Sequence, residues 1–165
     1  MAKESSFDVV SVVDMQEVDN ACQQAVREIA QRYDLKGSGA TLELSKKDAS
    51  FRIEAPSEFV ASQVRDVLAS KLTRRGIDLS AVRWADPQAA SGMTVRQAGT
   101  VVQGIDADTA KRISKDIRDL KVKAKATIEG DKLRVSSASK DVLQSVIAAL
   151  KERDYGQPLQ FVNYR

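Results

Sequence analysis

The sequence predicts an α+β protein in which one β-α-β-β-α-β unit is used twice. Short segments in which apolar and polar residues alternate indicate strands with one buried face. Longer segments with apolar residues three and four positions apart indicate helices. These segments follow one another in the same order twice, each time over about 80 residues. The 165 residues suffice for two small domains, and 42% hydrophobic residues are too many for a disordered chain.

The first copy of the unit occupies the first half of the chain. Asp14 is suited to cap a helix, and Glu17 stands at the position of a capping box. Gly76 is placed to end the second helix. The expected elements are strands at residues 7–13, 40–44, 51–55 and 82–84, and helices at 15–33 and 57–75.

A linker is expected at residues 86–92, and the same order of elements then returns. Asp106 and Ser139 are the expected helix caps of this second copy. Its expected strands are 94–103, 121–128, 133–135 and 159–164. Two such copies make tandem ferredoxin-like domains, in which helices cover one face of an antiparallel sheet and leave the other face bare.

Charge is distributed unevenly along the chain. The formal net charge is only +3, yet residues 1–109 carry −3 and residues 110–165 carry +6. A basic segment of this kind can attract an anionic partner, although uneven charge also serves solubility.

Most of the candidate binding residues lie in this basic segment. The two-residue period of a strand places Lys121, Lys123 and Lys125 on one face and the apolar residues between them on the other. The next strand adds Lys132 and Arg134. Five cations on the face without helices predict a phosphate-binding surface. The alternative is a solvated face whose lysines prevent edge-to-edge aggregation.

Two further groups of cations are weaker candidates for phosphate contacts. Arg74 and Arg75 could clamp a phosphate, but cations at the end of a helix also complement its dipole. Lys36 stands beside Gly37 and Gly39, which permit close approach of an anion to the backbone. A plain helix-ending turn explains the same residues.

Composition and failed motif searches argue against catalysis. The chain has no histidine, which excludes Ser-His-Asp and Cys-His systems and the commonest zinc sites. Gly99 and Gly104 have P-loop spacing, but Ile105-Asp106 follow them where Lys and Ser or Thr are required. The aromatic sheet motif of RNA-recognition domains is missing. Cys22 lies in an apolar stripe and is expected in the core. We expect no enzyme, no metal site and no cofactor.

Several segments resemble the YajQ family of bacterial nucleotide-binding proteins, in order along the whole chain. They are residues 6–11 (SFDVVS), 32–37 (RYDLKG), 71–78 (KLTRRGID), 103–106 (QGID), 121–124 (KVKA) and 158–165 (PLQFVNYR). The resemblance implies that the two ferredoxin-like domains exchange their first strands. Residues 1–13 would then join 104–165, and the strand at 93–103 would complete the domain of residues 14–103.

The resemblance also implies a function. We expect a cytoplasmic, non-catalytic protein that binds a nucleotide (ATP, GTP or cyclic-di-GMP) through phosphates on the basic sheet face. One alternative is a module that binds the backbone of tRNA or rRNA with little sequence preference. Another is a regulatory adaptor that contacts a transcription factor or DNA. We expect no membrane segment, since no apolar stretch approaches the required length of about 20 residues.

Overall fold

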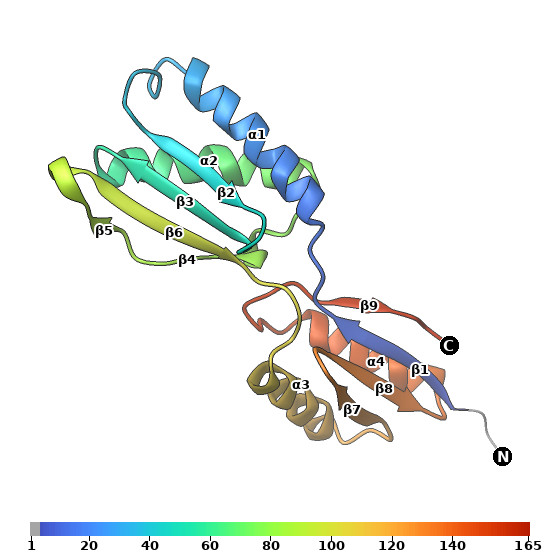
Figure 1. Cartoon of the computed structure of the whole chain (residues 1–165). Coiled ribbons are helices and arrows are strands. Elements are labelled where there is room, and N and C mark those ends of the chain that lie inside the picture. Colours follow the sequence, from blue (N-terminus) through green and yellow to red (C-terminus); the bar gives the residue numbers. More distant parts are fainter. Residues whose placement is uncertain (1–3) are drawn as a thin grey trace. The chain divides into compact units, whose positions relative to one another are not determined.

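The computed structural model describes residues 4–165, which fold into two compact units (Figure 1). The internal unit consists of Val13–Val102. The terminal unit combines Gln103–Arg165 with the described residues up to Val12. Each unit has its own buried apolar cluster.

The internal unit contains a five-stranded antiparallel sheet and two long helices. Its elements are α1 (Met15–Gln31), β2 (Thr41–Ser45), β3 (Ser50–Ala55), α2 (Glu58–Arg74), the 3-10 turn η1 (Leu79–Ala81), β4 (Val82–Trp84), β5 (Gln88–Ala89), η2 (Ser91–Met93) and β6 (Val95–Val101). The strand order is β2-β3-β6-β4, and β5 pairs with β6. Helices α1 and α2 pack on each other and on one face of the sheet.

The terminal unit repeats the arrangement with four strands. Its elements are β1 (Ser5–Val10), α3 (Ala107–Asp119), β7 (Lys125–Glu129), β8 (Lys132–Ser137), α4 (Lys140–Lys151) and β9 (Gln160–Val162). The strand order is β7-β8-β1-β9, with every pair antiparallel.

Both sheets therefore have the same topology, which confirms the tandem ferredoxin-like fold predicted from the sequence. In the terminal unit, β1 lies between β8 and β9. In the internal unit, β6 takes the equivalent central place between β3 and β4. The first strand of the chain thus completes the sheet formed by the last elements, and β6 completes the sheet formed by the elements before it.

The helix caps are where the sequence places them. The Asp14 carboxylate accepts hydrogen bonds from the N–H groups of Gln16 and Glu17, and Ser139 caps α4 in the same manner. Glu17 does not close a capping box, because its carboxylate instead contacts Arg75, the C-terminal cap of α2, and accepts a bond from Asn20.

The strands β6, β7 and β9 are shorter than predicted, and for β7 the structure shows why. The alternating pattern of residues 121–128 predicts a strand throughout, but β7 begins at Lys125. Lys121 adopts a left-handed φ of 55° as the chain leaves α3. The Ser137 hydroxyl donates to the carbonyl of Lys123 at 2.7 Å. The Lys123 carbonyl is therefore hydrogen-bonded to a side chain, whereas in a longer strand it would have paired with the backbone of β8. The predicted linker 86–92 also differs, since it contains β5.

Candidate phosphate-binding surfaces

The structure places the predicted cations in three separate regions. Lys121, Lys123, Lys125, Lys132 and Arg134 belong to the terminal unit, Arg74 and Arg75 to the end of α2, and Lys36 to the loop between α1 and β2. Nothing in either unit by itself brings all of them into one site.

Lys121, Lys123 and Lys125 form an exposed row that we call the lysine strip. The residues between them are half-buried against the core of the terminal unit, so the predicted sidedness is present even though only Lys125 lies in β7. None of the three makes an ion pair with any residue from 4 to 165. Their charges therefore remain available to an anion.

Lys132 and Arg134 have a different environment, because a buried carboxylate lies between β8 and the C-terminal strand. Asp8 on β1 is opposite Arg134 in the sheet and is 1% exposed. Its carboxylate accepts a bond from Arg134 Nε at 3.2 Å, and Lys132 Nζ lies 3.6 Å away. Arg134 also approaches Glu129 at 3.9 Å. These two cations are thus largely neutralised by acidic neighbours.

Asp8 is held ionised by its surroundings. The Asn163 side-chain amide donates to Asp8 Oδ2 at 2.8 Å, and this bond does most to lower the pKa of the carboxyl group. Burial opposes the effect, while the bond and charge of Arg134 and the charge of Lys132 add to it. Asp8 is not among the candidate residues predicted from the sequence. An aspartate inside a β-branched strand is unusual enough to be noticed in the sequence. Which residues bind this aspartate, however, depends on how the strands pair.

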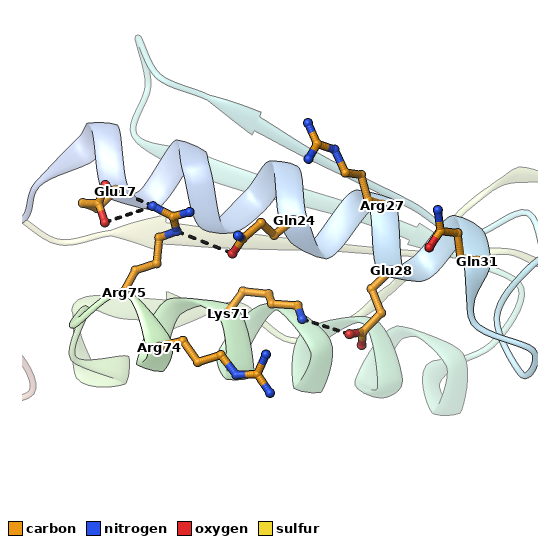
Figure 2. A pocket seen from close by; sticks show the side chains of 8 residues that line it. All are labelled: Glu17, Gln24, Arg27, Glu28, Gln31, Lys71, Arg74 and Arg75. Atoms are coloured by element: carbon orange, nitrogen blue, oxygen red, sulfur yellow. Dashed lines mark hydrogen bonds and ion pairs between the residues drawn. The ribbon is translucent and has the colours of Figure 1, made fainter.

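The second region is a hollow between α1 and α2, with a volume of about 620 Å³ (Figure 2). We call it the helix hollow. It is lined by Glu17, Gln24, Arg27, Glu28, Gln31, Lys71, Arg74 and Arg75.

Both acidic residues of the helix hollow are already engaged. Glu28 lies 2.9 Å from Lys71 Nζ, and this hydrogen bond is the main reason that the pKa of Glu28 is lowered. Glu17 lies 3.3 Å from Arg75. Arg27 and Arg74 form no ion pair with a described residue, so the hollow retains positive charge. Sequence reasoning missed Arg27, because a single arginine on the polar face of a helix has no distinguishing pattern.

The third region surrounds Lys36. This side chain is exposed at the rim of a cavity of about 330 Å³ between α1 and β2. Gly37 and Gly39, which also line the cavity, have φ values of 76° and 82°. The cavity wall is otherwise mainly aliphatic.

Buried titratable groups outside these regions have structural surroundings. Cys22 lies in the core of the internal unit, where burial and Asp19 raise the pKa of its thiol to about 11. The Tyr155 hydroxyl donates to Asp116 at 2.7 Å, and burial together with this bond raises the pKa of the phenol. Among residues 4–165, no three His, Cys, Asp or Glu side chains are grouped as metal ligands would be. No described helix is long and apolar enough to cross a membrane.

Comparison with known proteins shows to which family the chain is related. Residues 5–165 match the family model described as "Nucleotide-binding protein YajQ-like". The chain belongs to the YajQ family. This confirms the resemblance drawn from the sequence segments.

Curated relatives match this chain over essentially its whole length. A protein of Chloroherpeton thalassium is 44% identical over 165 residues, covering all of both chains. One from Nocardia farcinica is 53% identical over 163 residues, covering 98% of this chain and 99% of its own. A Desulfitobacterium hafniense protein is 48% identical over the full length of both. Each is named a nucleotide-binding protein.

Proposed function

We propose that this YajQ-family chain is a non-catalytic nucleotide-binding protein whose ligand phosphates contact the lysine strip. The supporting observation is that Lys121, Lys123 and Lys125 are exposed at alternate positions and have no acidic partner among residues 4–165. The three lysines lie within five consecutive residues, in a stretch that turns at Lys121 (φ 55°) and at Lys123 before it enters β7, so they can contact one phosphate chain. The names of the relatives support a nucleotide as the ligand.

The remaining predicted cations have different parts in this proposal. Lys132 and Arg134 lie opposite Glu129 and Thr127, beyond the strip along β7, and Asp8 offsets their charge, so they orient a ligand less strongly than the three lysines. Arg74 and Arg75 belong to the helix hollow, where Arg74 with Arg27 offers a second anion site. Lys36 lies in the third region, and its contact with a phosphate stays a prediction.

A binding role without catalysis fits the chemistry of the buried groups. Asp8 is held by Asn163 and Arg134, and Tyr155 by Asp116. Cys22 is buried, with a thiol pKa raised to about 11, so it is a poor nucleophile near neutral pH. We place the protein in the cytoplasm, where nucleotides are available.

The proposal is tested by charge reversal with a matched control. The variant K123E/K125E reverses two charges of the strip, and K111E/K115E makes the same change in net charge on exposed positions of α3. Binding of ATP, GTP and cyclic-di-GMP is measured by calorimetry at two salt concentrations. We expect the strip variant to lose at least about tenfold in affinity and the control to stay close to the parent. Equal affinity of parent and strip variant would show that the strip is not the site.

RNA is the second candidate, favoured because the exposed lysines of the strip have no acidic partner among residues 4–165. If three lysines contact phosphates of a single strand, affinity falls roughly 20-fold between 50 and 200 mM salt. Affinity that rises with oligonucleotide length identifies RNA as the ligand. Saturation by one small nucleotide identifies a nucleotide effector. Capture of a transcription factor or of DNA that depends on cyclic-di-GMP identifies the regulatory adaptor.

A further inference from the structure

We propose that the internal unit also binds the C-terminal end of a partner polypeptide, which adds to its sheet along the free edge of β2. The carboxylate of the peptide is held by Lys36 and the glycines of the preceding loop. Its last side chain, an aliphatic one, enters the cavity between α1 and β2. This binding surface belongs to the internal unit, whereas the lysine strip belongs to the terminal unit, and it does not depend on the nucleotide proposal.

The free edge of β2 supplies the backbone partners. β2 pairs with β3 only and stands at one end of the strand order β2-β3-β6-β4. The N–H and C=O groups of an edge strand that point away from its neighbour are open to another chain. Thr41 and Glu43 are exposed along this edge. An extended peptide can therefore gain main-chain hydrogen bonds there, as in other cases of strand addition.

The cavity beside β2 supplies the apolar contact. Its volume is about 330 Å³, and its wall includes Val26, Ile29, Ala30, Leu35 and Leu42. Val26 is 42% exposed, which leaves an aliphatic surface uncovered at the opening. Every second side chain of an added strand projects to the helix-covered side of the sheet, the side on which Leu42 is buried. Such a side chain would enter the cavity.

The loop before β2 supplies donors for a carboxylate. Gly37 and Gly39 have left-handed φ values of 76° and 82°, and a Cβ at either position would meet no atom within 4 Å. Packing therefore does not require these glycines. Their N–H groups donate to no acceptor in the described part of the chain. The Ser38 N–H between them donates to the Leu35 carbonyl at 3.1 Å, so the two N–H groups left for an anion are those of Gly37 and Gly39.

Charge and strand direction specify which end of the peptide binds. Lys36 is exposed and makes no ion pair with any residue from 4 to 165, so a cation stands beside the free N–H groups. This loop precedes the first residue of β2, Thr41. A peptide antiparallel to β2 has its C-terminus at that point. The geometry thus brings a carboxylate, a cation and the apolar cavity together.

The lining of the cavity favours a peptide over a nucleotide. No aromatic ring lines it, so a base would find no stacking partner. Glu43, which also lines the cavity, repels a carboxylate as well as a phosphate, so the discrimination rests on the aliphatic lining. An aliphatic side chain with a carboxylate near Lys36 satisfies both parts of the surface.

The experiment uses the full-length ¹⁵N-labelled protein. The probe is a pool of octapeptides with a free carboxylate, a C-terminal Val, Leu or Ile and random residues elsewhere, and a second pool is identical but amidated. We expect the free-acid pool to shift the amide resonances of Gly37, Gly39 and β2. Amidation should weaken binding at least about tenfold, because charge-assisted hydrogen bonds to the carboxylate are lost.

Three variants test whether the peptide binds through Lys36 and the cavity. K36E should weaken binding of the free-acid pool about tenfold or more, because it removes the cation next to the carboxylate. K47E makes the same charge change at the exposed turn after β2 and should stay within about twofold. V26E introduces a charge at the cavity opening and should also reduce binding, with circular dichroism confirming the fold.

Three outcomes would refute the proposal. The first is that millimolar free-acid peptide leaves the β2 resonances unchanged. The second is equal binding of the amidated pool, which would exclude a carboxylate site. The third is that ATP or GTP, and not the peptides, shifts Gly37 and Gly39, which would make the loop part of a nucleotide site.

Discussion

Replacing Asp8 by Asn tests whether one buried carboxylate organises the open face of the terminal sheet. Asp8 is 1% exposed and accepts bonds from Asn163 Nδ2 at 2.8 Å and from Arg134 Nε at 3.2 Å. Asn keeps the shape of the side chain, but it removes the charge and turns one acceptor into a donor. That donor must then face Arg134, which has no acceptor, or the N–H group that Asn163 now directs at Asp8.

The size of the effect follows from these contacts. Loss of one charge-assisted hydrogen bond at a buried acceptor costs about 1.5–3 kcal/mol. Arg134 and Lys132 are 39% and 35% exposed, so solvent screens their charges. Their attraction to Asp8 adds at most about 1 kcal/mol. We therefore expect the terminal unit to lose about 2–4 kcal/mol of unfolding free energy.

The assay is urea unfolding at neutral pH, followed by amide resonances of β1 and β8 in the terminal unit. The control is D119N, which makes the same charge change at an exposed position of α3 and should alter the free energy by less than about 0.5 kcal/mol. If D8N changes it as little as the control does, the carboxylate has no organising role.

The pH dependence gives a second check on Asp8. The folded state lowers the pKa of Asp8 below its ordinary value of 3.8, so the folded protein favours the ionised form. The contribution of Asp8 is therefore complete above the unfolded pKa and is lost as pH falls through the lower folded value. The stability gap between parent and D8N should be full at neutral pH and should narrow below pH 3.8. A gap that stays constant into this acidic range would contradict the assignment.

Two other predictions concern the internal unit. G99A should destabilise it by about 1–3 kcal/mol and shift the emission of Trp84, because the added Cβ would lie 2.6 Å from the indole ring; unchanged melting and emission would contradict this. Cys22, with its thiol pKa raised to about 11, should stay unreactive toward Ellman's reagent at pH about 8 and react fully in guanidinium, whereas rapid reaction of the folded protein would show that the thiol is accessible.

The local sequence pattern was sufficient to predict the order of the main helices and strands. Capping by Asp14 and Ser139 depends on neighbours within a few residues, so the sequence located both helix starts. Period-two alternation also gave the correct outward face of the lysine strip. It overestimated the length of β7, since the Ser137 hydroxyl, which binds the carbonyl of Lys123, lies on another strand.

For the candidate sites, the local sequence pattern predicted less. The sequence by itself determined the fold class, the absence of histidine chemistry and which side chains share a face along one strand. Only the tertiary structure decided that Asp8 lies beside Arg134, 126 positions away, and that Arg27 and Arg74 line one hollow. The physical reason is that alternation is a property of a single strand, whereas strand order is set by burying apolar faces of distant segments against each other. The strand order β7-β8-β1-β9 brings Asp8 beside Arg134 and so lowers the net charge there. The order β2-β3-β6-β4 leaves one edge of β2 free.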